Sequence, residues 1–309
     1  MSKDVHFRGK DLVSIADLTS AEVWRLIRKA AAQKKEISAH TLRGKTLALL
    51  FEKPSLRTRV SFDVAMCQLG GHCIYLSPQE VGLGKREPIQ DVARVLSRYV
   101  SGIVARTFAH ETVESLAKYA SVPVINGLSD FEHPCQALSD LLTIYEKKGK
   151  LEGIVLAYVG DANNVSNSLM LAAAMTGMKF RFASPSRYRV NDNVLAKAKH
   201  FASLSGAEIT TTDNPRAAVS GAQVVYTDVW VSMGQENETR ERLAVLAPYQ
   251  VNESLFAMAD KDAIFMHPLP AHHGEEITAG FTDIPQSVVF DQAENRLHLQ
   301  RTLLAEVMA

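Results

Sequence analysis

The stretch FEKPSLRTRVSFDVA at 51–65 follows an apolar run directly with hydroxyl and guanidinium side chains. We expect a strand to end where this stretch begins, and a helix to begin near Leu56 with Ser55 as its N-cap. The free N–H groups at a helix start favour an anion, and Arg57 and Thr58 add a cation and a hydroxyl. The pattern is typical of a phosphate site, although an ordinary capped helix with solvated arginines produces the same pattern.

The two arginines of this stretch have different expected roles. Residues two apart on a helix point to different faces. We therefore interpret Arg57 as the ligand and Arg59 as a partner in a structural ion pair. The stretch is not a Walker loop, because the sequence has no GxxxxGK[ST] element there.

Polar side chains also follow two other strands expected in the first half. Arg106 ends the run 102–107, while His133 and Gln136 lie one helical turn apart after the run 123–128. Ligands of open α/β sheets bind beyond the carboxyl ends of strands, so we expect these side chains at the same crevice as the phosphate site. Taken singly, each has a plainer explanation as a helix cap, a surface residue or a salt-bridge partner.

The second half contains a different set of polar strand ends. VGDANNVSNSL at 159–169 lacks GxGxxG, which disfavours a dinucleotide. In TDVWVSMGQE at 227–236, Asp228 can hold an ammonium, while Ser232 and the backbone beside Met233 can hold a carboxylate. Together they would bind the ammonium and carboxylate groups of an α-amino acid. The alternative is a strand-end aspartate followed by a surface loop.

FMHPLPAHHGEEI at 265–277 ends another expected strand. The prolines Pro268 and Pro270 predict an extended backbone whose carbonyls do not all enter a helix. His272 and His273 are adjacent and have no evident third ligand, which is weak evidence for a metal. We expect neither a metal nor a cofactor.

The composition sets outer limits on function. The chain has 309 residues, 46% hydrophobic and 22% charged, with 34 basic and 34 acidic residues. The absence of a basic excess argues against nucleic-acid binding, and no apolar run is long enough to span a membrane. The start of the chain has no signal-peptide pattern. Three cysteines without metal spacing indicate reduced thiols in a cytoplasmic protein: Cys67, Cys73 and Cys135.

Apolar runs and helix-period segments alternate along the whole chain, which predicts an α/β fold of two domains. Each domain should be a parallel sheet with helices on both faces. Strands are expected at 46–51, 72–76, 102–107, 123–128, 154–159, 179–184, 207–212, 223–227 and 263–267. Helices are expected at 20–36, 55–69, 88–100, 111–120, 133–148, 163–176, 191–204, 241–250 and 286–308.

The polar stretch EKKGKLEG at 146–153 marks the expected domain boundary. The first domain would comprise 1–148 together with a C-terminal helix, 286–309, that packs back on it. The second domain would comprise 149–285.

Together these residues resemble the aspartate/ornithine transcarbamoylase family, and within it the ornithine branch. The resemblance covers nearly the whole chain and rests on Ser55 to Arg59, Arg106, His133 to Gln136, Asn163 and Asn164, Asp228 to Gly234, His267 to Pro270, and Glu294 to Arg296. It implies two α/β domains, the first for carbamoyl phosphate and the second for L-ornithine. The expected reaction forms L-citrulline and phosphate in arginine metabolism, in a homotrimer or a multiple of trimers.

The resemblance also implies roles for individual residues. Three would be catalytic: Arg57, Arg106 and His133. Those that would bind carbamoyl phosphate are Ser55, Leu56, Arg57, Thr58, Arg106, His133, Gln136, Pro268, Leu269 and Arg296. Those that would bind ornithine are Asn164, Asp228, Ser232 and Met233.

The sequence departs from the family pattern at two positions. Ornithine enzymes of the family usually have cysteine where this chain has Pro268, which has neither a thiol nor an N–H donor. Gly82 stands where relatives often carry a side chain that reaches a neighbouring site. Two alternatives therefore stay open: a transcarbamoylase for putrescine, an acylated ornithine, lysine or aspartate, and a non-catalytic homologue that binds the same ligands. A dehydrogenase is disfavoured by the missing glycine pattern.

Overall fold

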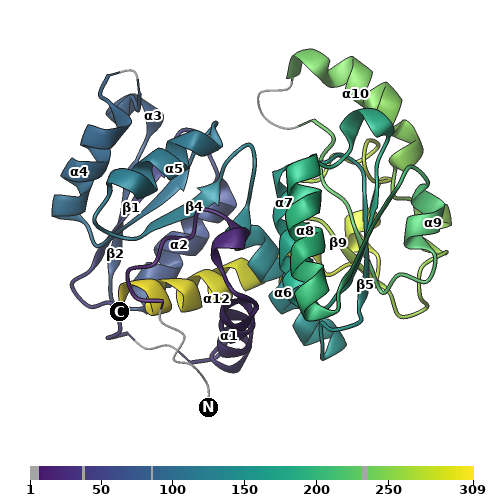
Figure 1. The fold of residues 1–309 in the computed structure, drawn as a ribbon, viewed down its shortest axis with the longest axis horizontal. Coiled ribbons are helices and arrows are strands. Elements are labelled where there is room, and N and C mark those ends of the chain that lie inside the picture. Colours follow the sequence, from purple (N-terminus) through teal and green to yellow (C-terminus); the bar gives the residue numbers. More distant parts are fainter. Residues whose placement is uncertain (1–6, 37–38, 85, 232–235) are drawn as a thin grey trace. The chain divides into compact units, whose positions relative to one another are not determined.

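The computed structural model describes residues 7–36, 39–84, 86–231 and 236–309 (Figure 1). Contacts divide the chain into two compact units. The first comprises Met1–Leu142 and Glu294–Ala309, and the second comprises Thr143–Ala293. The chain passes from one unit to the other inside helices, within α6 (Pro134–Lys148) and again within α12 (Val289–Met308).

The first unit is built on a four-stranded parallel sheet with the order β2-β1-β3-β4. Its strands are β1 (Thr46–Phe51), β2 (His72–Leu76), β3 (Gly102–Arg106) and β4 (Val124–Leu128). β1 and β3 are almost wholly buried, as their apolar sequences predict for central parallel strands. Phe51 pairs with Arg106 in the ladder, so these two strands end side by side.

Helices cover both faces of this sheet, as predicted. They are α1 (Ser20–Ala32), α2 (Leu56–Gln68), α3 (Pro78–Val81), α4 (Ile89–Tyr99), α5 (His110–Tyr119), and parts of α6 and α12. On one face, Ala48 and Ile103 pack in a core with Ala93 of α4 and Leu116 of α5. On the other face, Met308 of α12 lies against Gly102.

The C-terminal helix α12 contacts the rest of the first unit, which confirms that it packs back on this domain. Glu306 receives ion pairs from Arg25 and Lys29 of α1. Arg301 donates to the Gln68 side chain at the end of α2 at 2.9 Å. Residues 294–309 are therefore an integral part of the first unit.

The second unit has a five-stranded parallel sheet with the order β7-β6-β5-β8-β9. Its strands are β5 (Val155–Val159), β6 (Lys179–Ala183), β7 (Glu208–Thr212), β8 (Val224–Tyr226) and β9 (Ile264–Met266). β5 is the first strand in chain order and lies at the centre, with later strands on both sides. The strand order thus reverses beside β5, which is where such sheets bind ligands.

Helices lie on both faces here too: α7 (Asn164–Met175), α8 (Asp192–Ser205), α9 (Pro215–Val219), α10 (Thr239–Leu246) and α11 (Glu253–Phe256). The core of one face joins Val159 and Val225 to Val219 of α9 and Leu255 of α11. Short 3₁₀ turns occupy Ile15–Asp17, Ser186–Tyr188, Glu236–Glu238, Ala247–Tyr249 and Phe281–Asp283.

Most predicted elements match the structure to within a few residues. The helix expected at 241–250 instead ends at Leu246 and continues as a 3₁₀ turn that contains Pro248, because proline removes a helical hydrogen bond. The helix expected at 20–36 ends at Ala32. The sequence analysis missed α3, α9 and α11, which have only four or five residues each.

In the described residues, no helix combines the length and apolar character that a membrane span needs. Cys67, Cys73 and Cys135 are free thiols.

Candidate active site

The start of α2 has the geometry that the sequence predicts. Ser55 is its N-cap, in extended conformation, and its Oγ accepts a hydrogen bond of 3.2 Å from Thr58 N. No acidic side chain lies in the first turn of this helix, so the positive end of the helix dipole is not neutralised locally. The Leu56 side chain is 75% exposed, so only its main chain is suited to bind an anion here.

Arg106 lies at the end of β3, beside the chain segment that leads into α2. The ladder between β3 and β4 shifts register between Ala105 and Arg106, and such irregularities redirect a side chain at a strand end. Arg106 is 6% exposed. Its Nε has no hydrogen-bond partner in the part of the chain that the structure describes.

Arg296 of α12 joins two other predicted site residues. Its Nη2 donates to Thr58 Oγ1 at 2.7 Å, and its Nη1 donates to Gln136 Oε1 at 3.1 Å. The amide of Gln136 in turn donates to Asp140 at 2.8 Å. All four side chains are buried, so α2, α6 and α12 meet at one polar network.

The electrostatics of this cluster are strongly positive. Burial, together with the charges of Arg296 and Arg57, lowers the pKa of Arg106 to about 10. Burial and the charges of all three arginines lower the pKa of His133 well below its usual value. His133 is therefore neutral at physiological pH. A buried site with three guanidinium groups and a neutral imidazole is suited to a multiply charged anion.

The second arginine of the opening stretch has a different role from the predicted one. Arg59 stacks on the ring of Tyr75 in β2 at 3.9 Å from its centroid, and within the described ranges it has no carboxylate partner. The predicted ion pair of Arg59 therefore stays a prediction. The expectation that Arg57 and Arg59 differ in role is consistent with the structure, because only Arg57 interacts with the cluster around Arg106.

In the second unit, Asp228 follows β8 and bonds to the start of α7. Asn163 is the N-cap of that helix, and its Nδ2 donates to Asp228 Oδ2 at 2.7 Å. Asn164 is the first residue of the helix. Burial raises the pKa of the Asp228 carboxyl, which accepts hydrogen bonds from Val229 N and Asn163. The asparagine that contacts Asp228 is thus Asn163, which the predicted ornithine-binding set omits.

A buried ion pair lies just before the predicted carboxylate loop. Arg242 of α10 bonds to Asp161, and its Nε donates to the carbonyl oxygen of Trp230 at 2.6 Å. Neither charged residue of this pair was singled out in the sequence analysis, because they lie 81 positions apart. Two of the predicted ornithine-binding residues, Ser232 and Met233, lie outside the described residues.

The residues after β9 form a compact turn. Pro268 is buried and Leu269 is half-buried. Leu269 has φ 55°, and its peptide bond to Pro270 is cis. The predicted extended backbone is therefore wrong at Leu269. The main-chain N–H of Leu269 donates to His267 Nδ1 at 2.9 Å, which fixes the turn from inside.

Two family models match this chain, one in each half. The first, described as "Aspartate/ornithine carbamoyltransferase, carbamoyl-P binding domain", matches residues 10–146. The second, described as "Aspartate/ornithine carbamoyltransferase, Asp/Orn binding domain", matches residues 152–307. The chain belongs to the aspartate/ornithine carbamoyltransferase family.

Similar proteins in this family align with the chain from end to end. The ornithine carbamoyltransferase of Anoxybacillus flavithermus is 53% identical over 312 residues, which cover 100% of this chain and 99% of the relative. The solved ornithine carbamoyltransferase of Pyrococcus furiosus is 51% identical, with a TM-score of 0.95 and 98% of each chain covered. That of Gloeobacter violaceus is 45% identical, with a TM-score of 0.90, and covers 99% of this chain and 100% of its own.

In this family member, the position of Gly82 has a local explanation. Gly82 ends α3 with φ 56°, a conformation that favours glycine. A Cβ atom there would lie 2.8 Å from Cβ of Arg86. A larger residue at this position would therefore require Arg86 to shift.

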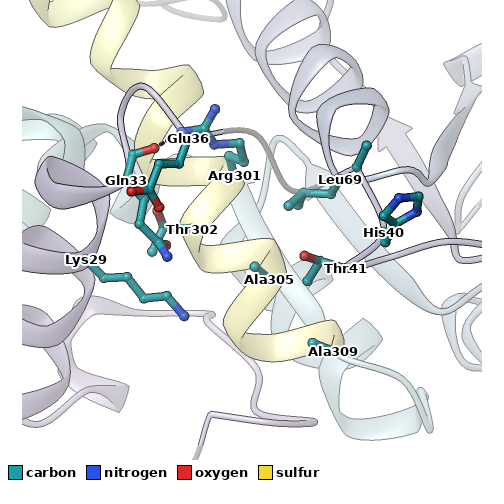
Figure 2. A pocket seen from close by; sticks show the side chains of 11 residues that line it. Lys29, Gln33, Glu36, His40, Thr41, Leu69, Arg301, Thr302, Ala305 and Ala309 are labelled. Carbon is teal, nitrogen blue, oxygen red and sulfur yellow. Dashed lines mark hydrogen bonds between the residues drawn. The ribbon is translucent and has the colours of Figure 1, made fainter.

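A pocket of about 590 Å³ lies elsewhere on the first unit of the carbamoyltransferase (Figure 2). It is lined by α1, α12 and the residues around His40, and none of the predicted site residues lines it. The cationic side chains that line this pocket already have partners within the protein. Lys29 pairs with Glu306, and Arg301 donates to the carbonyl oxygens of Gln33 and Lys34 at the end of α1. The chemistry of the family is therefore better matched by the cluster around Arg106.

The turn after β9 also contains a group of potential metal ligands. His272, Glu275 and Glu276 each place one ligand atom within 4.8 Å of the others, so His272 has further potential ligands nearby, although the sequence pattern showed no evident third ligand. Glu276 Oε1 already accepts a hydrogen bond of 2.6 Å from His272 N. That no metal binds here stays a prediction.

Proposed function

We propose that the chain transfers the carbamoyl group of carbamoyl phosphate to the δ-amine of L-ornithine, giving L-citrulline and phosphate. The observation that carries this proposal is the buried cationic cluster at the start of α2. Burial, together with the charges of Arg296 and Arg57, lowers the pKa of Arg106 there to about 10. A bound dianionic phosphate would relieve this repulsion, and the free N–H groups of α2 would add hydrogen bonds.

Each carbamoyl phosphate ligand has a role that follows from its position. Ser55, Leu56 and Thr58 would bind phosphate oxygens at the helix start, through main-chain N–H groups and hydroxyls. Arg57 and Arg106 would bind the phosphate and the carbonyl oxygen. Arg296 donates to Thr58 and to Gln136, and Gln136 and Arg296 would complete the site. The backbone at Pro268 and Leu269 would accept from the carbamoyl amide.

The reaction needs no covalent intermediate with the protein. The neutral δ-amine attacks the carbonyl carbon, a C–N bond forms, and a tetrahedral oxyanion develops. The C–O bond to phosphate then breaks, and the departing phosphate takes the proton that the amine loses. Neutral His133, with Arg106 and Arg57, would stabilise negative charge on the carbonyl and phosphate oxygens.

The second unit would bind the amino acid. Asp228, with its buried carboxyl group, would pair with the α-ammonium, supported by Asn164 and by Asn163. Ser232 and Met233, which lie outside the described residues, would hold the α-carboxylate. Ornithine is favoured over other acceptors because relatives named ornithine carbamoyltransferase are 49% to 53% identical to this chain along its whole length. The relative from Pyrococcus furiosus is named anabolic, which supports a role in arginine biosynthesis.

The proposed assembly is a homotrimer or a multiple of trimers. An apolar stripe on α2, formed by Leu56, Val60 and Val64, is exposed, and so is Ile74 on the edge strand β2. Exposed apolar stripes of this kind mark contacts between proteins. Light scattering on Val60→Glu and on wild type tests this: the variant should lose the trimer. We also propose that the protein works in the cytoplasm, where its free cysteines stay reduced.

Citrulline formation tests the function directly. Purified protein is given carbamoyl phosphate and L-ornithine, with putrescine, N-acetylornithine, lysine and aspartate in parallel reactions. We expect turnover with ornithine alone. Turnover with another amine would mean that this amine, and not ornithine, is the acceptor, while the proposed phosphate site would still hold. No turnover with any of the five amines, together with retained carbamoyl phosphate binding, would indicate a non-catalytic homologue.

Two neighbouring arginines test the phosphate site with matched variants. Arg57→Ala and Arg59→Ala remove the same charge two residues apart. Arg57→Ala should raise the carbamoyl phosphate KM by about tenfold or more, the effect of losing one charge-assisted hydrogen bond, and lower kcat. Arg59→Ala removes only the stacking on Tyr75 and should bind carbamoyl phosphate normally. An equal change of the carbamoyl phosphate KM in the two variants would contradict the proposed phosphate site.

A further inference from the structure

All three nitrogen atoms of His267 have hydrogen-bond partners inside the second unit. It is fully buried. Its main-chain N–H donates to Gln292 Oε1 at 2.9 Å. Its Nε2 lies 3.1 Å from Glu276 Oε1, and its Nδ1 accepts from Leu269 N at 2.9 Å. The ring therefore lies between a buried carboxylate and the backbone of the Leu269 turn.

These contacts fix the tautomer of the imidazole. The main-chain N–H of Leu269 can only donate, so Nδ1 must carry a lone pair and no proton. The proton of the neutral ring is then on Nε2, where it points to Glu276 Oε1. Such a second hydrogen bond is how proteins select one histidine tautomer. Because Glu276 binds the proton on Nε2, Nδ1 is left to accept the hydrogen bond from the Leu269 N–H.

The turn needs this support because of its backbone. Leu269 has φ 55°, a region that residues with a Cβ adopt rarely and that surrounding structure must hold. Pro268 has no N–H to contribute. Leu269 thus provides the first N–H after His267, and the imidazole accepts it. The Leu269 carbonyl belongs to the next peptide unit, and its direction relative to this N–H is set by the backbone torsions of Leu269.

Glu276 is the carboxylate that bonds to the His267 ring. It is fully buried, and its Oε1 accepts from His272 N as well as from His267. Its Oε2 has no hydrogen-bond partner in the described residues. An unsatisfied buried carboxylate oxygen is destabilising, so folding stability alone does not explain this group. Both Glu276 and His267 act electrostatically on Asp228, which places the pair beside the proposed amino-acid site.

We propose that Glu276 and His267 form a positioning pair for the Leu269 main chain: Glu276 holds the proton on Nε2, and Nδ1 holds the Leu269 turn in its left-handed conformation. This inference rests on the proposed function, in which the Leu269 carbonyl accepts from the carbamoyl amide. The pair acts on the reaction through Leu269 and does not touch substrate. This pair explains how the Leu269 turn is held although the preceding residue is Pro268, which has no N–H.

Two substitutions at position 267 separate the effect of the aromatic ring from the effect of the hydrogen-bond acceptor for Leu269 N–H. His267→Phe keeps an aromatic ring and removes the acceptor. His267→Asn removes the ring, but its side-chain oxygen can accept from the N–H two residues later, as in an Asx turn. With carbamoyl phosphate and ornithine, we expect His267→Phe to lower kcat by about 100-fold, the effect of a small misplacement of a reacting group. The KM of ornithine should change little, and His267→Asn should recover about tenfold of the loss.

A second pair of variants tests the carboxylate, and serves if His267→Phe does not fold. Glu276→Gln keeps an acceptor oxygen toward His267, whereas Glu276→Leu removes it. Glu276→Leu should lower kcat about as much as His267→Phe does, and Glu276→Gln should lower kcat much less. His273→Ala changes an exposed histidine of the same turn and should leave kcat unchanged. Carbamoyl phosphate binding and thermal unfolding are measured for each variant.

The outcomes separate this inference from the proposed function. Wild-type protein that fails to form citrulline contradicts the function, whatever the variants do. Active wild type with undiminished kcat in His267→Phe and Glu276→Leu contradicts the positioning pair and leaves the function intact. Equal losses in His267→Phe and His267→Asn would also contradict it, because the acceptor at position 267 would then not matter.

Discussion

Thr58 Oγ1 accepts a hydrogen bond of 2.7 Å from Arg296 Nη2, although the two residues lie 238 positions apart in the chain. Thr58 belongs to the first turn of α2, and Arg296 to the C-terminal helix α12. Both are buried. The proposed phosphate site therefore depends on α12 as well as on β1 and α2.

Arg296→Ala should weaken carbamoyl phosphate binding strongly. It removes one cation of the cluster and the hydrogen bonds to Thr58 and Gln136. Hydrogen bonds to charged groups contribute about 1.5–3 kcal/mol, so KM for carbamoyl phosphate should rise by about tenfold to 100-fold. Steady-state kinetics with Arg25→Ala provides the control, because Arg25 is a partly exposed arginine paired with Glu306. An equal rise in the control would contradict the prediction.

His133 should make the protein less stable as the pH falls below about 6.5. Its folded-state pKa is far below the usual value because burial and three arginines oppose its charge. Below pH 6.5 the unfolded chain binds a proton that the folded chain does not, so this contribution to stability is present above that pH and is lost on acidification. Between pH 6.5 and 5.5, wild type should lose about 1 kcal/mol more free energy of unfolding than His133→Gln.

Urea unfolding in phosphate-free buffer measures this difference, because phosphate would bind the same cluster. A variant that loses stability in parallel with wild type over this range would show that His133 is protonated in the folded protein.

Asp228→Asn should impair ornithine use and spare carbamoyl phosphate. The substitution keeps the shape of the side chain and its ability to accept from Val229 N. It removes the charge for the α-ammonium, together with the oxygen that accepts from Asn163. We expect the ornithine KM to rise by about tenfold to 100-fold, as for the loss of a charge-assisted bond. Isothermal titration with carbamoyl phosphate alone should give wild-type affinity. Weakened carbamoyl phosphate binding would mean that the substitution disturbs more than the amino-acid site.

Arg242→Met should destabilise the protein far more than Arg187→Met. Arg242 pairs with Asp161 where both side chains are buried, while the pair of Arg187 with Glu241 is exposed. Breaking a buried pair leaves an uncompensated charge, at about 3–5 kcal/mol, against about 0–1 kcal/mol for an exposed pair. Chemical denaturation at pH 8 compares the two variants. Similar losses would indicate that solvent reaches the Asp161 pair.

The loss in Arg242→Met should also grow with pH. Burial raises the pKa of Asp161 to about 6 even with Arg242 present, and removal of the cation raises it further. A carboxyl whose pKa is higher in the folded state contributes stability at low pH, and this contribution is lost as the pH rises through the folded-state value. The variant should therefore approach wild type more closely at pH 5.5 than at pH 8.

Local signals predicted much of this fold and part of the site. Ser55 was identifiable as an N-cap because the hydroxyl, the helix start and the preceding apolar run are adjacent in sequence. The strands were identifiable because buried parallel strands are short continuous apolar runs. The short helices α3, α9 and α11 gave too few turns for a periodic signal.

The contacts that the sequence did not reveal are those between distant segments. Arg59 stacks on Tyr75 because β2 pairs beside β1, which no pattern within 51–65 indicates. Asp161 meets Arg242, and Asn163 meets Asp228, because β5 and β8 are neighbours in the sheet. The Leu269 N–H bonds to the His267 ring, which in turn contacts a glutamate nine positions away.

The division of the first unit between residues 1–142 and 294–309 constrains the order in which the protein forms during translation. Domains fold as units as the chain leaves the ribosome. The second unit is one continuous segment, 143–293, inserted between the two parts of the first unit. The first unit cannot be complete until the whole second unit has been synthesised, because Arg296, which bonds to Thr58, follows it in the chain. A chain that stops before residue 294 thus lacks part of the proposed phosphate site.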